Sequence, residues 1–443
     1  MSVDTEDYMS TSYFDGVDDR QMDSMRVLSE TAAEFPQAIS FSSGAPFDRN
    51  YSLNDLQMCL NAYCRHVASN SEMEPALLRN LFHYSDVNGF IRQEIVDYLR
   101  IEEGLDVEVD ELMMTNGFQE GLLVVLRGLK TSSADVFLCA EPVYVGVTGA
   151  ARMLDIPVVG IPQGPNGITS EQVTAAVEKV NSDGGRVMGV YVNPDNSNPS
   201  GTSMPLEERH AMLNAASELE FFLIEDNPYR IFSPEAEIAP SLKSLDWDKR
   251  VISIGSFAKS VFPGARLGYV YADRLIGNDP VDAAPMAKRF SAIKSMYSVG
   301  TSSLSQAVVA GALISEEFGY RNRIDQAREA YLNRLNVTLN ALEEHFPPSE
   351  VAHHGVSWTP PAGGFFVVIN TAFDANFDAM RESASAFAVS WAPMRMFYTL
   401  GGGEKAIRLG FSNLTPERIS EGIRRLAQFN AHLLVKQGVP HDA

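Results

Sequence analysis

The sequence is poor in cysteine and in positive charge, and it has no long apolar run. Its 443 residues include three cysteines, too few for the disulfide framework of a secreted scaffold. No apolar run reaches the roughly 20 residues that cross a bilayer. The acidic segment 1–23 lacks the charged-then-apolar pattern of a signal peptide. These absences predict a cytoplasmic protein that binds no membrane.

The shortage of basic residues also excludes a class of partner. Lys and Arg number 35 against 57 Asp and Glu, which gives a formal net charge of −22. Binding to nucleic acid rests on clustered Lys and Arg, so we expect no nucleic-acid partner. The hydrophobic share of 45% and the charged share of 21% are ordinary for a globular enzyme.

Strand and helix patterns alternate from about Tyr84 onward. Strands are predicted at 111–115, 135–139, 186–192, 221–225 and 251–254, with helices at 119–129 and 205–219. This alternation favours an α/β fold with a mainly parallel sheet that helices cover on both faces.

The pattern changes after a helical stretch at 325–345. Strands at 364–369 and 406–411 and a helix at 416–436 predict a smaller α+β domain. We expect three segments: 1–69 packs on the small domain, 70–330 forms the large domain, and 331–443 forms the small domain.

Polar clusters follow the predicted strands of the large domain. They are Asn116-Gly117, Glu141-Pro142, Asn193-Pro194, Glu225-Asp226 and Gly255-Ser256. Chemistry in parallel sheets gathers at the carboxyl ends of the strands. The sequence therefore predicts one site built from these strand ends.

The most informative segment is Gly255-Ser-Phe-Ala-Lys-Ser-Val-Phe-Pro-Gly-Ala-Arg-Leu-Gly268. The amine of Lys259 can condense with the aldehyde of a cofactor, while Ser256 and Arg266 can bind a phosphate on it. This combination suits pyridoxal 5'-phosphate.

A pyridoxal cofactor needs further groups, and the chain has candidates for each. Asp226 can face the ring nitrogen, Tyr229 and Asn198 can bind the ring oxygen, and Tyr144 can stack on the ring. The turn Gly117-Phe118-Gln119 offers backbone N–H groups for the phosphate at a helix start. Taken singly, each could equally be an ordinary turn, cap or core residue. Together they occur in one order along the chain, each at a predicted strand end.

This series resembles class I/II aminotransferases of fold type I, in the aminoadipate, kynurenine and aromatic subgroup, over residues 39–427. The resemblance implies a large domain with a seven-stranded sheet. It also implies that Lys259 binds the cofactor covalently, that Asp226 pairs with the ring nitrogen, and that Asn198 and Tyr229 bind the ring oxygen. Phosphate contacts would fall to Gly117, Phe118, Gln119, Ser256 and Arg266.

The resemblance also implies roles beyond the ring and the phosphate pocket. Arg408 would bind the substrate carboxylate, although a surface strand position would explain this arginine equally well. Asn198 and Gly44 would line the substrate pocket, and Tyr84 would reach the phosphate of a neighbouring subunit in a homodimer. Phe118 and Ala258 depart from the family, where hydroxyl residues are common.

The implied reaction is transamination between an L-amino acid and a 2-oxo acid such as 2-oxoglutarate. The segment 140–152 and Phe257-Ala-Lys259-Ser look like arylglycine aminotransferases, and Phe47, Phe365 and Phe397 would suit an aromatic substrate. Arg49 could instead bind the distal carboxylate of an aminoadipate-like substrate.

Two other functions stay open. Another reaction of the same cofactor at the α-carbon (elimination, decarboxylation or oxidation) depends on bond orientation, which the sequence does not determine. The second alternative is the effector domain of a transcription regulator with this fold. The short acidic stretch before Gly44 disfavours that reading. We expect no bound metal, because Cys59, Cys64 and His66 match no common zinc spacing.

Overall fold

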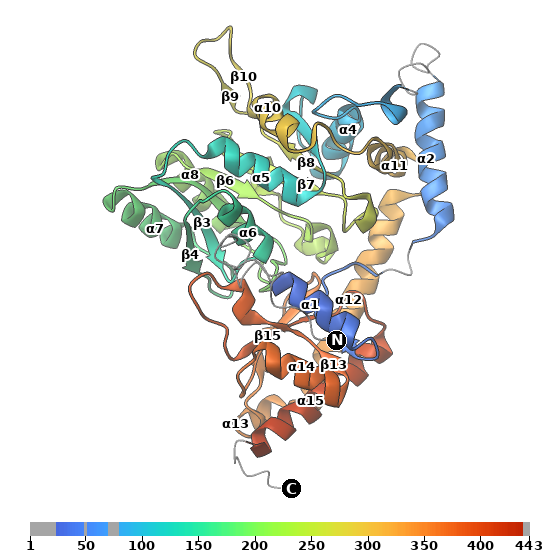
Figure 1. The fold of residues 1–443 in the computed structure, drawn as a ribbon, viewed down its shortest axis with the longest axis vertical. Coiled ribbons are helices and arrows are strands. Elements are labelled where there is room, and N and C mark those ends of the chain that lie inside the picture. Colours follow the sequence, from blue (N-terminus) through green and yellow to red (C-terminus); the bar gives the residue numbers. More distant parts are fainter. Residues whose placement is uncertain (1–23, 48–50, 70–78, 437–443) are drawn as a thin grey trace, which may run out of the picture.

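The computed structural model describes residues 24–47, 51–69 and 79–436. Its centre is a seven-stranded sheet (Figure 1). The strands are β2 (Leu112–Thr115), β3 (Asp135–Glu141), β4 (Val158–Pro162), β5 (Arg186–Val192), β6 (Phe222–Glu225), β7 (Val251–Ser256) and β8 (Gly268–Tyr271). They lie in the order β2-β8-β7-β6-β5-β3-β4, and β8 is antiparallel to both of its neighbours while the other pairs are parallel.

Helices cover both faces of this sheet because neighbouring strand residues are apolar on both sides. Phe137 and Cys139 pack with α5 (Phe118–Leu129), α6 (Val145–Met153) and α10 (Met286–Ser298). Leu138, between them, packs with α7 (Ser170–Ser182) and α8 (Leu206–Glu218). Strands buried on both faces are typical of parallel sheets. The predicted α/β class with a mainly parallel sheet is confirmed.

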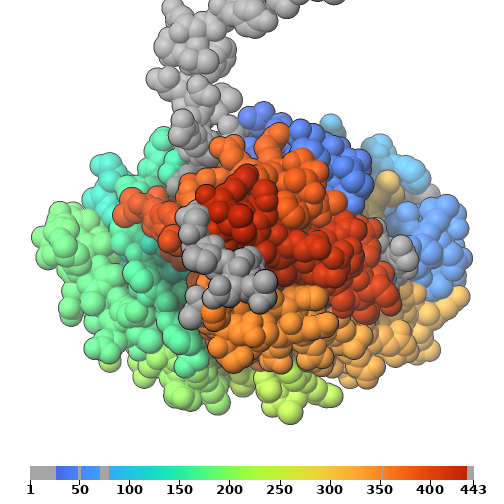
Figure 2. Space-filling view, turned by 90° about the horizontal axis from the view of Figure 1, so that it is seen from below, coloured from blue at the N-terminus to red at the C-terminus, as the bar shows by residue number. Residues whose placement is uncertain are grey.

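A second, smaller sheet lies in the C-terminal part of the chain. It contains β11 (Ser357–Trp358), β12 (Phe366–Asn370), β15 (Ala406–Gly410) and β14 (Ala392–Pro393), in that order and all antiparallel. The helices α12 (Tyr320–His345), α14 (Phe377–Phe387) and α15 (Pro416–Lys436) bury their apolar faces with it in one cluster. In Figure 2 this part, orange to red, forms the face toward the viewer.

The N-terminal segment contacts both parts. The strand β1 (Ile39–Ser40) pairs in parallel with β13 (Val389–Ser390) of the C-terminal part. The helix α2 (Leu53–Ala68) packs instead on α11 (Ser303–Ile314) so closely that a Cβ on Gly311 would lie 1.8 Å from the carbonyl oxygen of Cys59. The single helix α12 runs through the predicted boundary at 330, and the division of the chain at 69 and 330 stays a prediction.

Within the described residues, no helix is long and apolar enough to span a membrane. The helix α1 (Ser24–Glu34) and the segment after β1 lie between the two sheets (Figure 1). This arrangement places N-terminal residues opposite the carboxyl ends of β3, β5, β6 and β7.

Candidate active site

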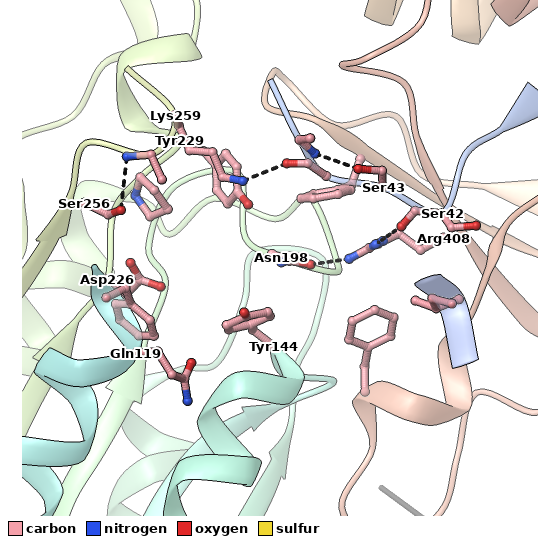
Figure 3. Close-up of a pocket in the computed structure, with 18 of the residues that line it drawn as sticks. Ser42, Ser43, Gln119, Tyr144, Asn198, Asp226, Tyr229, Ser256, Lys259 and Arg408 are labelled. Atoms are coloured by element: carbon pink, nitrogen blue, oxygen red, sulfur yellow. Dashed lines mark hydrogen bonds between the residues drawn. The ribbon is translucent and has the colours of Figure 1, made fainter. Parts of the chain in front are cut away.

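A cavity of about 600 Å³ lies where the two parts of the molecule and the N-terminal segment meet. Figure 3 shows its walls. Lys259, Ser256, Asp226 and Tyr229 come from the large sheet, and Arg408 faces them from the small sheet. Most of the residues predicted to bind the cofactor or the substrate carboxylate line this cavity, and Gly117 and Tyr84 are the exceptions. The predicted residues that line it are Gly44, Phe118, Gln119, Tyr144, Asn198, Asp226, Tyr229, Ser256, Lys259, Arg266 and Arg408.

Lys259 lies three residues after β7 in the turn that leads to β8. Its Nζ donates a hydrogen bond of 2.8 Å to the carbonyl oxygen of Gly44 in the N-terminal segment. Burial and, to a smaller extent, the Arg408 guanidinium lower the pKa of this amine to about 8, although the Asp226 carboxylate acts in the opposite direction. A lysine with a lowered pKa supplies the neutral amine that attacks an aldehyde.

Asp226 follows directly after β6 and is buried. Its Oδ2 accepts a hydrogen bond of 2.8 Å from the hydroxyl of Tyr191, and its carbonyl oxygen accepts one from Asn193. Burial raises the pKa of this carboxyl to about 7, while the Tyr191 hydrogen bond and the Lys259 charge lower it. The remaining carboxylate oxygen is suited to a protonated ring nitrogen.

Arg408 projects from the middle of β15 and is buried. Nη1 donates to Oδ1 of Asn198 and Nη2 to the carbonyl oxygen of Ser42, each at 2.7 Å. Its Cζ lies 4.3 Å from the ring centre of Phe366 and 4.8 Å from that of Phe397.

The guanidinium of Arg408 is incompletely satisfied. Its Nε is buried and has no hydrogen-bond partner among the described residues. Burial lowers the pKa of the group to about 10, which leaves it charged. A planar buried cation with a spare donor fits an incoming carboxylate.

Tyr229 and Asn198 form one polar pair beside Lys259. The Asn198 side chain donates to the Tyr229 hydroxyl. Burial and the Asp226 charge raise the pKa of this hydroxyl above its usual range. The backbone N–H of Asn198 is held at 2.8 Å by the side-chain oxygen of Asn193. The Nζ of Lys259 lies 6.0 Å from the ring centre of Tyr229.

The opposite end of the cavity fits a phosphate. Gly117 caps α5 with φ of +78°, and a Cβ there would lie 2.8 Å from Nη2 of Arg266. Only glycine combines this backbone conformation with so close a guanidinium. The helix start, Arg266 and Ser256 together supply the donors that an anion needs. With the Lys259 amine and the Asp226 carboxylate, this donor set fits pyridoxal phosphate.

Phe118 makes aromatic contacts at the start of α5. Its ring centre lies 6.4 Å from that of Tyr144 and 6.3 Å from that of Tyr191. Gln119 beside it donates at 2.7 Å to the carbonyl oxygen of Gly146 in α6. We infer that Phe118 helps to fix both tyrosine rings at the cavity.

Several sequence-based candidates lie elsewhere. Tyr84 is 90% exposed and away from the cavity of its own chain. Phe365 is buried and packs with Tyr331. Phe47 packs against the same core cluster and lies on the guanidinium of Arg334. Phe397 lines the cavity. Arg49 lies outside the described residues.

Residues on three elements line the cavity although the sequence analysis did not predict them as site residues. Tyr191 was assigned only to a buried strand, where an aromatic residue is ordinary. Phe366, not its neighbour Phe365, faces the cavity, and alternation along a strand does not tell which of two adjacent residues points inward. Leu28, Ser29 and Ala32 of α1 also line the cavity, and no motif marks them. The described residues contain no metal-binding group of three or more His, Cys, Asp or Glu.

Comparisons with known proteins agree with this geometry. The family model of aminotransferase class I and II matches residues 58–426. The (S)-3,5-dihydroxyphenylglycine transaminase of Amycolatopsis orientalis is 36% identical over 410 residues, 92% of this chain and 91% of that protein. Aromatic-amino-acid aminotransferase 1 of Thermococcus litoralis is 28% identical over 348 residues, 78% of this chain and 79% of that protein.

A solved structure is similar over nearly the whole chain. The kynurenine aminotransferase of Pyrococcus horikoshii, determined in complex with PMP, superposes with a TM-score of 0.80 at 25% identity. The match covers 97% of this chain and 98% of that one.

Proposed function

The chain belongs to the class I and II aminotransferase family, which uses pyridoxal phosphate, and we propose that it transfers the amino group of an aromatic L-amino acid, of the arylglycine type, to a 2-oxo acid. The observation that carries the proposal is the single cavity in which the Lys259 amine, the Asp226 carboxylate and the Arg408 guanidinium meet. The same three groups serve bond making, charge stabilisation and substrate binding.

The aromatic preference is supported by the cavity walls and by one relative. Phe366, Phe397 and Tyr144 line the cavity beside Arg408, and α1 contributes small or apolar side chains. Among the described lining residues, Lys259, Arg266 and Arg408 are the cations, and each has a role in the proposed reaction. No further cation of the described wall is left for the distal carboxylate of an aminoadipate. The relative that is 36% identical to this chain is named as a transaminase of dihydroxyphenylglycine, which is an arylglycine.

We assign the proton transfer to Lys259. The bound cofactor supplies an aldehyde carbon and an electron-accepting ring. Lys259 is the residue that would hold the cofactor at its aldehyde carbon. Its Nζ, which is neutral above a pKa of about 8, would also take up the proton of the substrate α-carbon.

The other polar side chains orient the ring and hold its charge. The Asp226 carboxylate would keep a proton on the ring nitrogen, because an ion pair at this buried position stabilises the charged form. Asn198 and Tyr229 would hold the ring oxygen, and Tyr144 would pack on the ring. The α5 N-terminus at Gly117, Phe118 and Gln119 would bind the phosphate together with Ser256 and Arg266.

Arg408 orients the substrate by its α-carboxylate. The two ends of the guanidinium are already fixed by Asn198 and Ser42, so little side-chain entropy is lost when a carboxylate binds. The segment at Gly44 closes the cavity from the N-terminal side and helps to exclude water.

We also propose a homodimer in which Tyr84 completes the phosphate site of the partner. Lys294 is buried and donates at 2.7 Å to the carbonyl oxygen of Val87, which holds the Tyr84 loop beside the end of α10. The segments on both sides of this contact carry exposed apolar side chains, namely Phe82, Tyr84, Met296 and Leu304. Exposed apolar side chains that lie together are typical of a subunit interface.

Mixed dimers test this assignment. Lys259→Ala and Tyr84→Ala proteins should each be impaired, and co-refolded hybrids should regain activity, because one of their two sites then has both residues intact. Hybrids that regain none would contradict a role for Tyr84 in the partner's site. The cytoplasmic location stays a prediction.

A donor panel tests the function itself. The holoenzyme is incubated with phenylglycine, hydroxyphenylglycine, phenylalanine and 2-aminoadipate, each with 2-oxoglutarate, and glutamate is measured. We expect the fastest glutamate formation with the arylglycines. Carbon dioxide, ammonia or peroxide without glutamate would identify another reaction at the α-carbon. Binding to DNA without any turnover would support the regulator alternative.

A further inference from the structure

Glu141, the last residue of β3, links the large sheet to the C-terminal part of the molecule. Its Oε1 accepts hydrogen bonds from the backbone N–H of Thr399 and, at 2.7 Å, from the Thr399 hydroxyl. Two residues further along, the N–H of Val143 donates at 2.8 Å to the carbonyl oxygen of Phe397. The strand end that leads to Tyr144 is thus bound to the turn 397–399 by three hydrogen bonds.

The neighbouring strand leaves room for this carboxylate. Gly160 of β4 lies beside Glu141, and a Cβ there would be 2.8 Å from both the carboxyl carbon and one carboxylate oxygen. Its backbone φ is not in the left-handed region, so space and not conformation requires the glycine. The carboxylate of Glu141 therefore has a position that β4 keeps open.

The turn that Glu141 holds carries a wall of the substrate site. The ring of Phe397 is 2% exposed, lines the cavity and lies against Arg408. The chain after Thr399 is poorly held, because Leu400 is 90% exposed and residues 401–403 are glycines. The contact with Glu141 therefore holds the chain directly before an exposed leucine and a glycine run.

We propose that Glu141 is a positioning residue that fixes Phe397, and through it the aromatic wall of the substrate site, by holding the turn 397–399 against β3. The inference rests on the proposed function for the kind of substrate. The hydrogen bonds between Glu141 and Thr399 are separate from those of Lys259 with Gly44 and of Asp226 with Tyr191 at the cofactor end of the cavity. Aromatic ligands lose affinity when this contact is removed, whereas small carboxylates that need only Arg408 do not.

The experiment compares four variants of the holoenzyme. Glu141→Ala removes the acceptor, and Glu141→Gln keeps an oxygen that both Thr399 donors can reach. Gly160→Ala leaves the carboxylate in the chain but displaces it. Glu404→Ala is the matched control, because this exposed carboxylate of the same loop accepts from the backbone N–H of Gly402 within the glycine run.

Two measurements are made on each variant. Dissociation constants for phenylacetate and for acetate are determined from the visible absorption of the bound cofactor, and hydrogen exchange is followed in the peptide that contains residues 397–399. We expect Glu141→Ala and Gly160→Ala to raise the dissociation constant of phenylacetate by about tenfold, which corresponds to one net hydrogen bond to a charged group. The dissociation constant of acetate should not change. Exchange in the turn becomes faster by a similar factor. Glu141→Gln and Glu404→Ala stay close to the unmodified protein.

Each other outcome overturns the proposal. Equal weakening of both ligands would mean a general structural role, and unchanged exchange would mean that Glu141 does not hold the turn. Should Glu141→Ala fail to fold, Thr399→Val against Thr399→Ser makes the same comparison from the donor side. An unmodified protein that transfers nitrogen from no aromatic donor would contradict the proposed substrate, while the exchange measurement would still decide the role of Glu141.

Discussion

The hydroxyl of Tyr191 lies 2.8 Å from Oδ2 of Asp226, and both side chains are buried at the carboxyl edge of the large sheet. Burial and the neighbouring Glu225 raise the pKa of Asp226 and so favour the neutral carboxyl. The hydrogen bond from Tyr191 and the charge of Lys259 lower the pKa and so favour the charged carboxylate. Tyr144 and Tyr229 also face this carboxylate and are neutral at physiological pH. Tyr191 thus keeps Asp226 in the state that a protonated ring nitrogen requires.

Replacing Tyr191 by Phe should raise the pKa of Asp226 above about 7. The shift should be about one pH unit, because a hydrogen bond to a charged group contributes about 1.5 kcal/mol and one unit corresponds to about 1.4 kcal/mol. The protonated carboxyl band of the apoprotein can be followed by infrared spectroscopy against pH, with Asp226→Asn as the reference. A midpoint that does not move would show that the hydrogen bond is without effect on the charge.

Gly117→Ala should weaken cofactor binding by about tenfold. The left-handed backbone costs an alanine about 1–2 kcal/mol, and the new methyl group would displace Arg266 from the phosphate end. Gly149→Ala in α6 is the control, since a Cβ there meets no atom within 4 Å. Dissociation constants for pyridoxal phosphate are compared by fluorescence of the apoproteins, and equal constants would argue against a phosphate at Gly117.

Arg408→Lys should raise the KM for the amino-acid donor by about a hundredfold although the charge is kept. The ammonium of lysine lacks the planar fork that lets arginine bind Asn198 and Ser42 and still present donors to a carboxylate, and two charge-assisted hydrogen bonds amount to roughly 3 kcal/mol. The visible spectrum should be unchanged, because Arg408 does not bind the cofactor in this account. A normal KM would place the substrate carboxylate elsewhere.

Cofactor capture by the apoprotein should accelerate with rising pH around a midpoint near 8. Burial and the Arg408 charge lower the pKa of Lys259 from 10.5 to about 8, so the reactive neutral amine accumulates as the pH rises through that value and is saturated above it. Arg408→Met removes one of these causes and should move the midpoint upward. Stopped-flow absorption measures both rates, and a midpoint near 10 in the unmodified protein would contradict the lowered pKa.

Much of the large sheet could be predicted because its strands are continuous apolar runs between turn residues. The strand at 186–192 has the predicted bounds, and those at 111–115, 135–139, 221–225 and 251–254 differ by one or two residues. The edge strand β4 was missed because only one of its five residues, Ile161, is buried, so its apolar pattern is weak. The strand β8 was missed because it follows the Lys259 turn without an intervening helix.

Site residues could be predicted from the sequence where the proposed chemistry requires one residue type. They could not be predicted where packing alone brings a residue to the cavity. A lysine and an aspartate just after strands of the large sheet, and an arginine in a strand of the small sheet, have few other reasons to lie together in a cavity. Tyr191 and Phe366 look like any strand aromatics, and Glu141 looks like a turn residue until the position of Thr399 is known. The roles of α1 and Tyr84 depend on how distant segments or a second subunit pack, which no local pattern contains.

Borohydride reduction of the holoenzyme followed by peptide mass spectrometry tests the central claim most directly, because reduction makes the bond between Lys259 and the cofactor permanent. We predict one modified peptide, which contains Lys259 and the added mass of the reduced cofactor, and no such peptide in Lys259→Ala protein, which should also form no glutamate from any donor. A cofactor found on another lysine, or transfer activity that survives in Lys259→Ala, would contradict the account.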